Sequence, residues 1–171
     1  MKKLIIVGAG GYAKSVLDSV DHMNFQMVGF LDDIKSKGEK HQGFPILGNT
    51  IDCIVNPEDY VYFVAIGNNA KRKIWFDKLK ERKLSLINVI DKSALVSQAA
   101  TIGEGSFIGK LAILNHGSSV GDNCVINTFR FYFFCRNPNY CSMRFNIFND
   151  YSFRTNQSPC SYRQLAIYNS S

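Results

Sequence analysis

The chain has 171 residues, of which 46% are hydrophobic and 20% are charged, and this size fits one ordinary domain or two small ones. Its net charge of +6 does not predict a nucleic-acid-binding protein, because residues 1–128 hold 15 Lys and Arg against 13 Asp and Glu and most of the excess lies in residues 129–171. Five cysteines without paired spacing predict neither a disulfide framework nor a metal site, and Cys53 and Cys124 are interpreted as buried small apolar residues.

The start of the chain predicts a cytoplasmic protein. Two lysines lead at once into an apolar strand and a glycine turn, a pattern that does not match a signal peptide. No run of 18 apolar residues occurs in the sequence, so we expect no membrane-spanning segment and no membrane partner.

A βαβ unit is predicted for residues 3–33. A strand leads into a glycine turn, an amphipathic segment follows, and a second strand over residues 26–31 ends at Asp32 and Asp33. The turn reads Gly8-Ala9-Gly10-Gly11-Tyr12-Ala13-Lys14. Glycines let a phosphate approach the backbone, a helix N-terminus offers free N–H groups, and Asp32 lies where a carboxylate can accept hydrogen bonds from a ribose or base. The unit therefore predicts a nucleotide ligand.

Two alternatives stay open for this turn. It is compatible with a simple connection between a strand and a helix, and the G-x-G-x-x-A spacing of Gly8, Gly10 and Ala13 is typical of NAD binders. An NAD-linked oxidoreductase is the less favoured function, because the rest of the chain predicts no second catalytic domain for hydride transfer.

A third buried strand is predicted for residues 60–66, and Gly67 follows it. Parallel sheets bind ligands at the carboxyl ends of their strands, so Ile66 and Gly67 are predicted to lie beside the nucleotide. A helix is predicted for residues 69–82. Its inward side is assigned to Ile74, Trp75 and Leu79, and its solvated side to Lys71, Arg72, Lys78, Lys80 and Glu81.

Residues 94–126 repeat with a period of six. Each hexad has an aliphatic residue at one fixed position, a small residue two positions before it and a turn-compatible residue after it. The aliphatic residues are Val96, Ile102, Ile108, Leu114, Val120 and Ile126, and the small residues are Ala94, Ala100, Ser106, Ala112, Ser118 and Cys124. This period fits a coil of short strands and turns, in which the aliphatic side chains stack inside and the small residues occupy tight corners.

Residues 129–171 differ from the rest of the chain. They hold seven Phe and five Tyr but no Gly, Lys or His, and the hexad period stops at Ile126. Translation of an out-of-frame stretch of AT-rich DNA is the favoured interpretation. A genuine aromatic extension over the open end of the coil is the second, and an aromatic, arginine-rich nucleic-acid binder is the third, which the scattered arginines disfavour.

The motifs in this order resemble the family of sialic acid O-acetyltransferases and bacterial UDP-sugar N-acetyltransferases. Beside the glycine turn, the resemblance rests on Gly29-Phe30-Leu31-Asp32-Asp33, Val64-Ala65-Ile66-Gly67-Asn68-Asn69 and Ser119-Val120-Gly121-Asp122-Asn123-Cys124-Val125-Ile126-Asn127-Thr128. It implies an α/β Rossmann-like domain over residues 1–90, a truncated left-handed parallel β-helix of about two coils over residues 91–128 and an aberrant tail over residues 129–171.

The resemblance also implies the function. The substrate is a nucleotide-linked amino sugar or sialic acid, acetyl-CoA is the co-substrate, and the intact family forms homotrimers in surface glycan synthesis. The substrate-binding positions that match the family are Gly8, Gly10, Gly11, Tyr12, Asp32, Asp33, Ile66 and Gly67. No metal and no nucleic acid are expected as partners.

The family's catalytic histidine is expected near position 134, where this chain has Phe134. Without a base for the proton of the attacking amine or hydroxyl, a rate loss of roughly 10²–10⁴ is expected. His116 is the only histidine of the hexad region, and its place on a turn makes it a weak candidate for a substitute base. We therefore expect an acetyltransferase homologue that is inactive as written, or a non-catalytic nucleotide-sugar-binding module.

Overall fold

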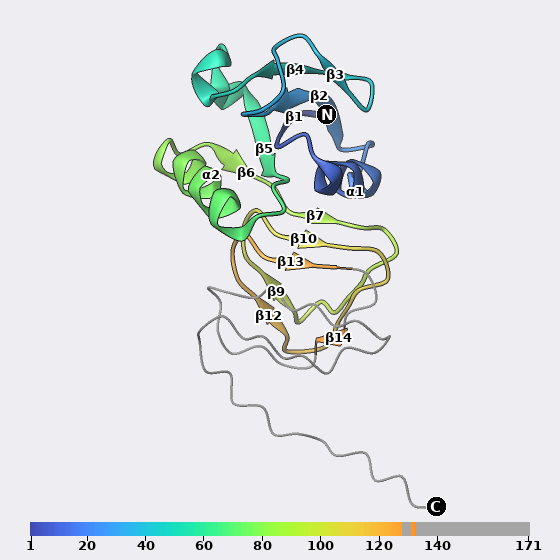
Figure 1. Cartoon of the computed structure of the whole chain (residues 1–171). Helices are drawn as coiled ribbons and strands as arrows, with labels where there is room; N and C mark the ends of the chain where they lie inside the picture. Colours follow the sequence, from blue (N-terminus) through green and yellow to red (C-terminus); the bar gives the residue numbers. More distant parts are fainter. Residues whose placement is uncertain (128–130, 133–171) are drawn as a thin grey trace, which may run out of the picture.

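The computed structural model describes residues 1–127 and 131–132. Figure 1 shows two stacked parts, an α/β part that ends with strand β6 and a coil that begins with strand β7. The predictions for the tail after residue 128 lie outside the described residues, apart from the short strand β14 (Phe131–Tyr132). Within the described part, the helices are too short or too polar to cross a membrane.

The α/β part is built on a six-stranded sheet in the order β3-β4-β2-β1-β5-β6. Its strands are β1 (Lys2–Val7), β2 (Phe25–Leu31), β3 (Lys40–His41), β4 (Phe44–Gly48), β5 (Tyr60–Val64) and β6 (Ser85–Leu86). All neighbours are parallel except β3 and β4. The strand order reverses between β1 and β5, so the carboxyl ends of these two strands form the switch point at which sheets of this kind bind ligands.

Two α-helices cover the sheet, α1 (Gly11–Ser19) and α2 (Asn69–Glu81), and the short helices η1 (Ile51–Cys53) and η2 (Pro57–Asp59) connect β4 to β5. Leu4 and Ile6 of β1 share one core cluster with residues of α1, whereas Ile5 and Val7 share another with Leu79 of α2. Because β1 is buried on both faces, its sequence is a continuous apolar run rather than an alternating one.

The predicted orientation of α2 is wrong at two positions. Arg72 is 6% exposed and lies on the buried side with Phe76 and Leu79, whereas Ile74 is 54% exposed. The buried residues follow the i, i+4, i+7 spacing of a helix stripe. The prediction placed Arg72 on the solvated side, but its guanidinium is satisfied by hydrogen bonds inside the molecule.

The two cysteines that were interpreted as buried differ. Cys124 is buried inside the coil, as predicted, whereas Cys53 is exposed in η1. Cys53 lies in a surface connection, where its small side chain packs on the backbone: a Cβ added at Gly48 would stand 2.5 Å from the Cys53 Sγ. A small apolar residue in a surface connection therefore need not enter the core.

The hexads form a coil of two-residue parallel strands. These are β7 (Val89–Ile90), β8 (Leu95–Val96), β9 (Thr101–Ile102), β10 (Phe107–Ile108), β11 (Ile113–Leu114), β12 (Ser119–Val120), β13 (Val125–Ile126) and β14. They stack in three parallel sheets, β7-β10-β13, β8-β11-β14 and β9-β12, with partners 18 residues apart. Each hexad is thus one side of a three-sided coil, and pairing begins at Val89.

The interior of the coil confirms the six-residue pattern. One cluster contains all six aliphatic residues together with Ala94, Ala100, Ala112 and Cys124. The serines at the small position are also buried, and the Ser106 Oγ accepts a hydrogen bond from the Cys124 N–H and donates one to the Gly121 carbonyl. A small side chain at the corner thus leaves room for neighbouring backbone groups to be satisfied.

The two parts share a hydrophobic core. Val89 and Phe107 of the coil belong to the same cluster as Leu4 and Ile6 of the central strand. The ring of Tyr12 in α1 meets the ring of Phe107 edge to face, with centroids 5.6 Å apart. The first turn of α1 is therefore seated directly on the coil.

Candidate functional site

Two turns leave the sheet together at the switch point. Val7 of β1 lies opposite Val64 of β5 in the parallel register, so the turns that follow these strands start at the same edge (Figure 1). The Ala65 N–H donates to the Val7 carbonyl at 2.7 Å and ties the second turn to the first. The structure thus brings the glycine turn and the Ile66–Gly67 turn to one edge of the sheet.

Gly8 is the packing point between these turns. Its φ of +99° lies in the left-handed region, and a Cβ added there would stand 2.8 Å from the Ile66 Cγ1 and 2.9 Å from the Ala65 carbonyl oxygen. Its N–H donates to the Leu31 carbonyl at 2.7 Å. Gly8 therefore allows the two turns to pack closely together, and its contact with a ligand stays a prediction.

Gly10, Gly11 and Gly67 border open space, because a Cβ added at any of them would meet no atom within 4 Å. Gly10 is the N-cap of α1, and the first turn of this helix has neither a side-chain cap nor an acidic residue. The positive end of the helix dipole and its free N–H groups therefore face this space, and both favour an anionic group such as a phosphate.

Asp32 holds the glycine turn in place. Its carboxylate accepts hydrogen bonds from the N–H groups of Ala9 at 2.6 Å, Ile34 at 3.0 Å and Lys35 at 2.9 Å. Burial opposes ionisation of this carboxyl, but the backbone donors outweigh it and lower its pKa below the ordinary value. Asp32 therefore carries its charge at neutral pH and orients the turn, and its contact with a ribose or base stays a prediction.

Asp33 and Tyr12 differ in accessibility. Asp33 is exposed at the end of β2, with the Lys71 Nζ 3.8 Å from its carboxylate. The Tyr12 hydroxyl is buried and has no hydrogen-bond partner among the described residues. Burial raises the pKa of this phenol, and the nearby Arg72 cation only partly offsets the effect. Tyr12 is therefore a neutral group with an unsatisfied hydroxyl.

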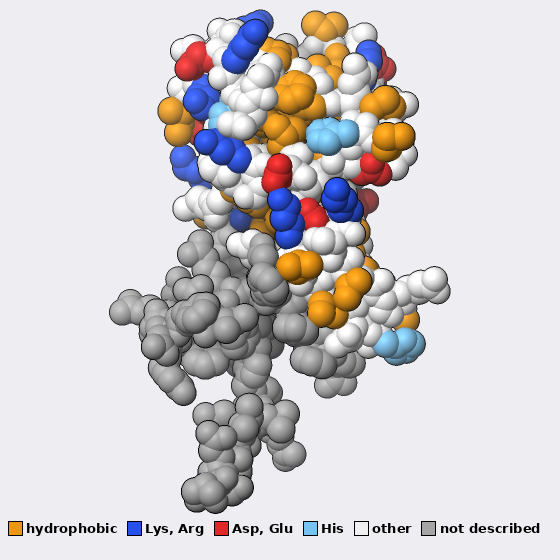
Figure 2. Space-filling view, turned by 90° about the vertical axis from the view of Figure 1, so that its right-hand side faces the viewer, with side chains coloured by type: hydrophobic (Ala, Val, Ile, Leu, Met, Phe, Trp, Pro, Cys, Tyr) orange, Lys and Arg blue, Asp and Glu red, His pale blue; other side chains and the backbone are white. Residues whose placement is uncertain are grey.

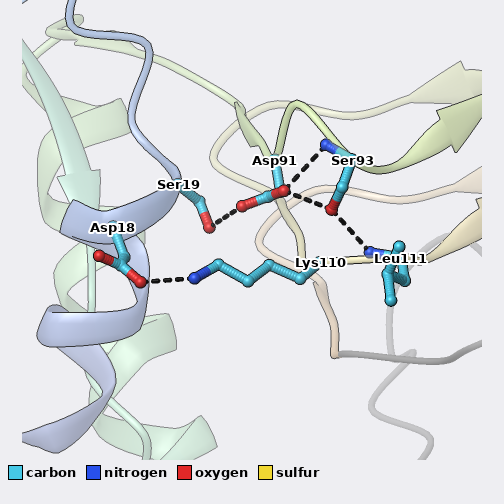
Figure 3. Close-up of polar contacts among 6 residues, drawn as sticks. All are labelled: Asp18, Ser19, Asp91, Ser93, Lys110 and Leu111. Atoms are coloured by element: carbon cyan, nitrogen blue, oxygen red, sulfur yellow. Dashed lines mark hydrogen bonds and ion pairs between the residues drawn. The ribbon is translucent and has the colours of Figure 1, made fainter.

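A buried carboxylate that the sequence did not single out joins α1 to the coil. Asp91 is 4% exposed and accepts hydrogen bonds from the Ser19 Oγ at 2.6 Å, the Ser93 N–H at 2.9 Å and the Ser93 Oγ at 2.6 Å (Figure 3). Burial opposes its ionisation, but these donors lower its pKa below the ordinary value. We call Ser19, Asp91 and Ser93 the Asp91 junction.

An ion pair between Lys110 of the coil and Asp18 of α1 lies beside this junction (Figure 3). Figure 2 shows side chains of both charge signs close together at the level where the α/β part meets the coil. Both partners of the pair are half exposed, so the pair contributes less to stability than the buried hydrogen bonds beside it.

A second junction links α2 to the coil on the other side. The Arg72 guanidinium donates to the Ile66 carbonyl and to Asn123 of the coil. We call Arg72, Ile66 and Asn123 the Arg72 junction. The helix spacing of Arg72 with Phe76 and Leu79 is the one sequence signal that indicated its buried position.

The histidine candidates lie apart from this edge in the sequence. His116 is exposed on the turn between β11 and β12, as predicted for a turn residue. Phe134, at the position where the family's base is expected, lies outside the described residues. The described part therefore supplies a nucleotide-type edge and a coil, and the histidine beside the glycine turn is His41, which is buried and contacts the Gly10 backbone.

Comparison with known proteins identifies both parts. Residues 3–79 match the model of the PglD N-terminal domain, and residues 99–129 match the model of the bacterial transferase hexapeptide with six repeats. The chain is 32% identical to the UDP-N-acetylbacillosamine N-acetyltransferase of Bacillus subtilis over 113 residues. This match covers 63% of this chain and 51% of that protein. Both parts of the chain thus resemble sugar N-acetyltransferases, which confirms the resemblance inferred from the four motifs.

Solved structures of sugar N-acetyltransferases have the same architecture. A mutant of the perosamine N-acetyltransferase of Caulobacter crescentus, in complex with CoA and GDP-perosamine, matches with a TM-score of 0.67 and 28% identity over 77% of this chain and 62% of that one. The acetyltransferase domain of PglB from Neisseria gonorrhoeae matches with a TM-score of 0.65 and 28% identity over 77% and 67%. Its complex with acetyl coenzyme A matches with a TM-score of 0.57 and 29% identity over 76% and 69%.

The chain spans only part of the length of the relatives that it matches. It spans about half of the Bacillus protein and 23% of a longer mimivirus protein, with which it shares 29% identity over 119 residues. The ligands and reactions of those proteins therefore carry over to this chain only as a proposal.

Proposed function

We propose that the chain binds a nucleotide-linked amino sugar at the edge formed by Gly10, Gly11 and Gly67. We further propose that the reaction for which its fold is built is acetyl transfer from acetyl-CoA to this sugar. The observation that carries the proposal is the acid-free, uncapped first turn of α1, which opens at the switch point directly above a hexapeptide coil. CoA, GDP-perosamine and acetyl coenzyme A accompany the solved relatives. The α/β part would then be a Rossmann-like domain that holds the nucleotide phosphates.

The chemistry of this reaction requires a base. The sugar amine attacks the thioester carbonyl, an amide bond forms, the thiolate leaves, and a base accepts the amine proton. The sequence has Phe134 where the family's histidine is expected, and His116 is exposed on a turn. We infer that this chain has little or no transferase activity as written. The proposal includes a sialic acid hydroxyl as an alternative acceptor. A hydroxyl that attacks the thioester must also lose its proton to a base, so the same inference about activity applies to it.

A non-catalytic nucleotide-sugar-binding module is the second candidate, and Phe134 favours it. An NAD-linked oxidoreductase is the third, since Gly8, Gly10 and Ala13 keep the spacing of NAD binders. All three candidates predict a ligand at the first turn of α1, so they are separated by which ligand stabilises the protein.

Thermal unfolding with a ligand panel tests the proposal. The full chain is heated with UDP-N-acetylglucosamine, a GDP-sugar, NAD or acetyl-CoA, each at the same concentration. A higher melting temperature with a nucleotide sugar than with NAD is expected, because at equal concentration the ligand that binds more tightly stabilises the folded state more. A rise with NAD alone would replace the proposal by the oxidoreductase. Thioester cleavage in the presence of an amino-sugar acceptor would show that the chain is catalytic.

The tail, the hand of the coil and the assembly belong to the same proposal. We infer that residues after Thr128 are read out of frame, that the coil is left-handed and truncated, and that the homotrimer of the family is doubtful for this chain. Leu95, Leu111 and Ile90 are exposed apolar residues on the coil, which is compatible with self-association.

Resequencing the DNA across Thr128 tests whether the residues after it are read out of frame. Another frame that continues the hexads and encodes a histidine within about ten codons is expected. Light scattering of the purified chain measures the assembly.

A further inference from the structure

Arg72 is a buried cation at the edge of the proposed nucleotide site. Its Nη1 donates to the Ile66 carbonyl at 3.1 Å, its Nε donates to the Asn123 Oδ1 at 3.2 Å, and its Nη2 lies 3.5 Å from the Asn123 carbonyl. Within the described residues no carboxylate forms an ion pair with it. The acceptors of this guanidinium among the described residues are therefore all neutral oxygens.

The contact with Ile66 fixes the orientation of one peptide group. The Ile66 carbonyl and the Gly67 N–H belong to the same peptide bond, and in a planar trans peptide these two groups point in opposite directions. Because Arg72 holds the carbonyl on its own side, the Gly67 N–H points away from Arg72. That N–H donates to no group in the part of the chain that the structure describes, and Gly67 itself borders open space.

The charge of Arg72 is unfavourable for the folded protein alone. It lies near the N-terminus of α2, where the helix dipole is also positive, and burial lowers its pKa because the cation is removed from water. A buried charge without an opposite charge is costly, and an apolar side chain of similar size packs as well. These features favour a role of Arg72 toward a ligand over a role in the core.

The second contact connects the peptide to the coil. Asn123 is at φ +53°, and its N–H donates to the Glu104 carbonyl at 2.8 Å, so its side chain is held on a fixed turn. Arg72 therefore ties the Ile66–Gly67 turn to the coil as well as to α2. The placement of the turn depends on both parts of the molecule.

We propose that Arg72 is a positioning residue of the nucleotide site, which aims the Gly67 N–H at an acceptor oxygen of the bound nucleotide sugar. This inference rests on the proposed function and names a residue that acts through another one. It differs from the positions assigned by resemblance, because Arg72 lies behind the turn and is itself inaccessible.

Calorimetric titration with UDP and with GDP, well below the melting temperature, tests this role. Arg72→Met is expected to weaken nucleotide binding by roughly tenfold or more, as the loss of a hydrogen-bond donor predicts. Arg72→Lys is expected to weaken it by a smaller factor. Asn123→Gly, which suits the positive φ, removes the side-chain acceptor and is expected to weaken binding less than Arg72→Met. Lys80→Ala is the matched control, since Lys80 also links α2 to the coil, through Glu104, without touching Ile66. Its affinity is expected to equal that of the unchanged chain.

A second readout separates positioning from a merely structural role. In amide NMR spectra of the unchanged chain, nucleotide is expected to shift the Gly67 N–H strongly, and this shift is expected to shrink in Arg72→Lys. Equal affinities of the unchanged chain and the Arg72 variants would overturn the role of Arg72 and leave the proposed function intact. A Gly67 N–H that does not respond to bound nucleotide would also overturn it. Failure of the unchanged chain to bind any nucleotide would overturn both.

Discussion

The two junctions between the α/β part and the coil bury charges of opposite sign in different surroundings. At the Asp91 junction, a carboxylate receives three hydrogen bonds from Ser19 and Ser93. These donors outweigh burial and lower the pKa of Asp91, which favours its charge. At the Arg72 junction, a guanidinium has neutral acceptors, but burial outweighs them and lowers its pKa, which disfavours its charge. The difference teaches that a buried charge can serve folding where its hydrogen bonds outweigh burial, whereas a charge that burial disfavours points to a role outside folding.

The largest effect is expected from Asp91→Ala, which removes the acceptor of the Asp91 junction. Buried donors of Ser19 and Ser93 would lose their partner, so the free energy of unfolding should fall by about 3 kcal/mol. Urea denaturation measures it. Asp77→Ala is the control, because Asp77 is a half-exposed partner of Lys73 on α2. A change at Asp91 no larger than that of the control would contradict a stabilising junction.

The pH dependence of stability sharpens the same point. The pKa of Asp91 is lowered in the folded protein, so its contribution is fully present above the unfolded pKa of about 4 and is lost as the pH falls through the lower folded pKa. Asp91→Asn should therefore be less stable at pH 7 and should lose less stability than the unchanged chain between about pH 5 and pH 2. Parallel pH curves for the two proteins would show that this carboxylate is not responsible.

Tyr12→Phe is expected to stabilise the protein, in contrast to the loss at Asp91. The hydroxyl that it removes is buried without a partner, and an unsatisfied buried group of this kind costs about 1 kcal/mol or more. Thermal and urea unfolding measure the gain. The same variant tests Tyr12 as a substrate-binding residue: unchanged nucleotide affinity would limit its role to the packing of its ring on Phe107, whereas weaker binding would show that its hydroxyl reaches the ligand.

Arg72→Met is expected to change the free energy of unfolding by less than about 1 kcal/mol, the smallest effect in this series, because the loss of three hydrogen bonds is offset by removal of an uncompensated charge. The comparison of the junctions depends on this contrast with Asp91→Ala. A loss as large as that of Asp91→Ala would mean that Arg72 serves folding in the same way.

The sequence predicted the repeating features of the fold well. The apolar run of β1, the glycine turn and the hexads are short-range patterns, and each corresponds to one physical requirement: burial on two faces, close approach of the backbone, or stacking inside a coil. The positive φ values at Gly105, Leu111, Gly117 and Asn123, six residues apart, were not predicted. Only two of these four residues are glycines, so the residue types alone did not reveal that the backbone is left-handed at this position of these hexads.

The junctions could not be predicted, because they depend on contacts between distant residues. Arg72 and Asn123 are 51 positions apart, and Ser19 and Asp91 are 72 positions apart. A single sequence places basic residues in solvent by default, and this default failed at Arg72. Asp32 shows a similar limit: its position predicted a ribose-binding acid, which stays a prediction, but did not reveal that its carboxylate accepts hydrogen bonds from the N–H groups of Ala9, Ile34 and Lys35.

The most direct test of nucleotide binding at the first turn of α1 compares Gly10→Asp with Gly10→Asn. Both side chains fit the extended backbone of this N-cap and the open space beside it, and both are good caps, so the two variants differ mainly in charge. Calorimetric titration with UDP and GDP should show binding weakened by roughly tenfold or more in the aspartate variant relative to the asparagine variant, since a carboxylate repels the phosphates. Equal affinities in the two variants would contradict a phosphate at this helix end and, with it, the proposed site.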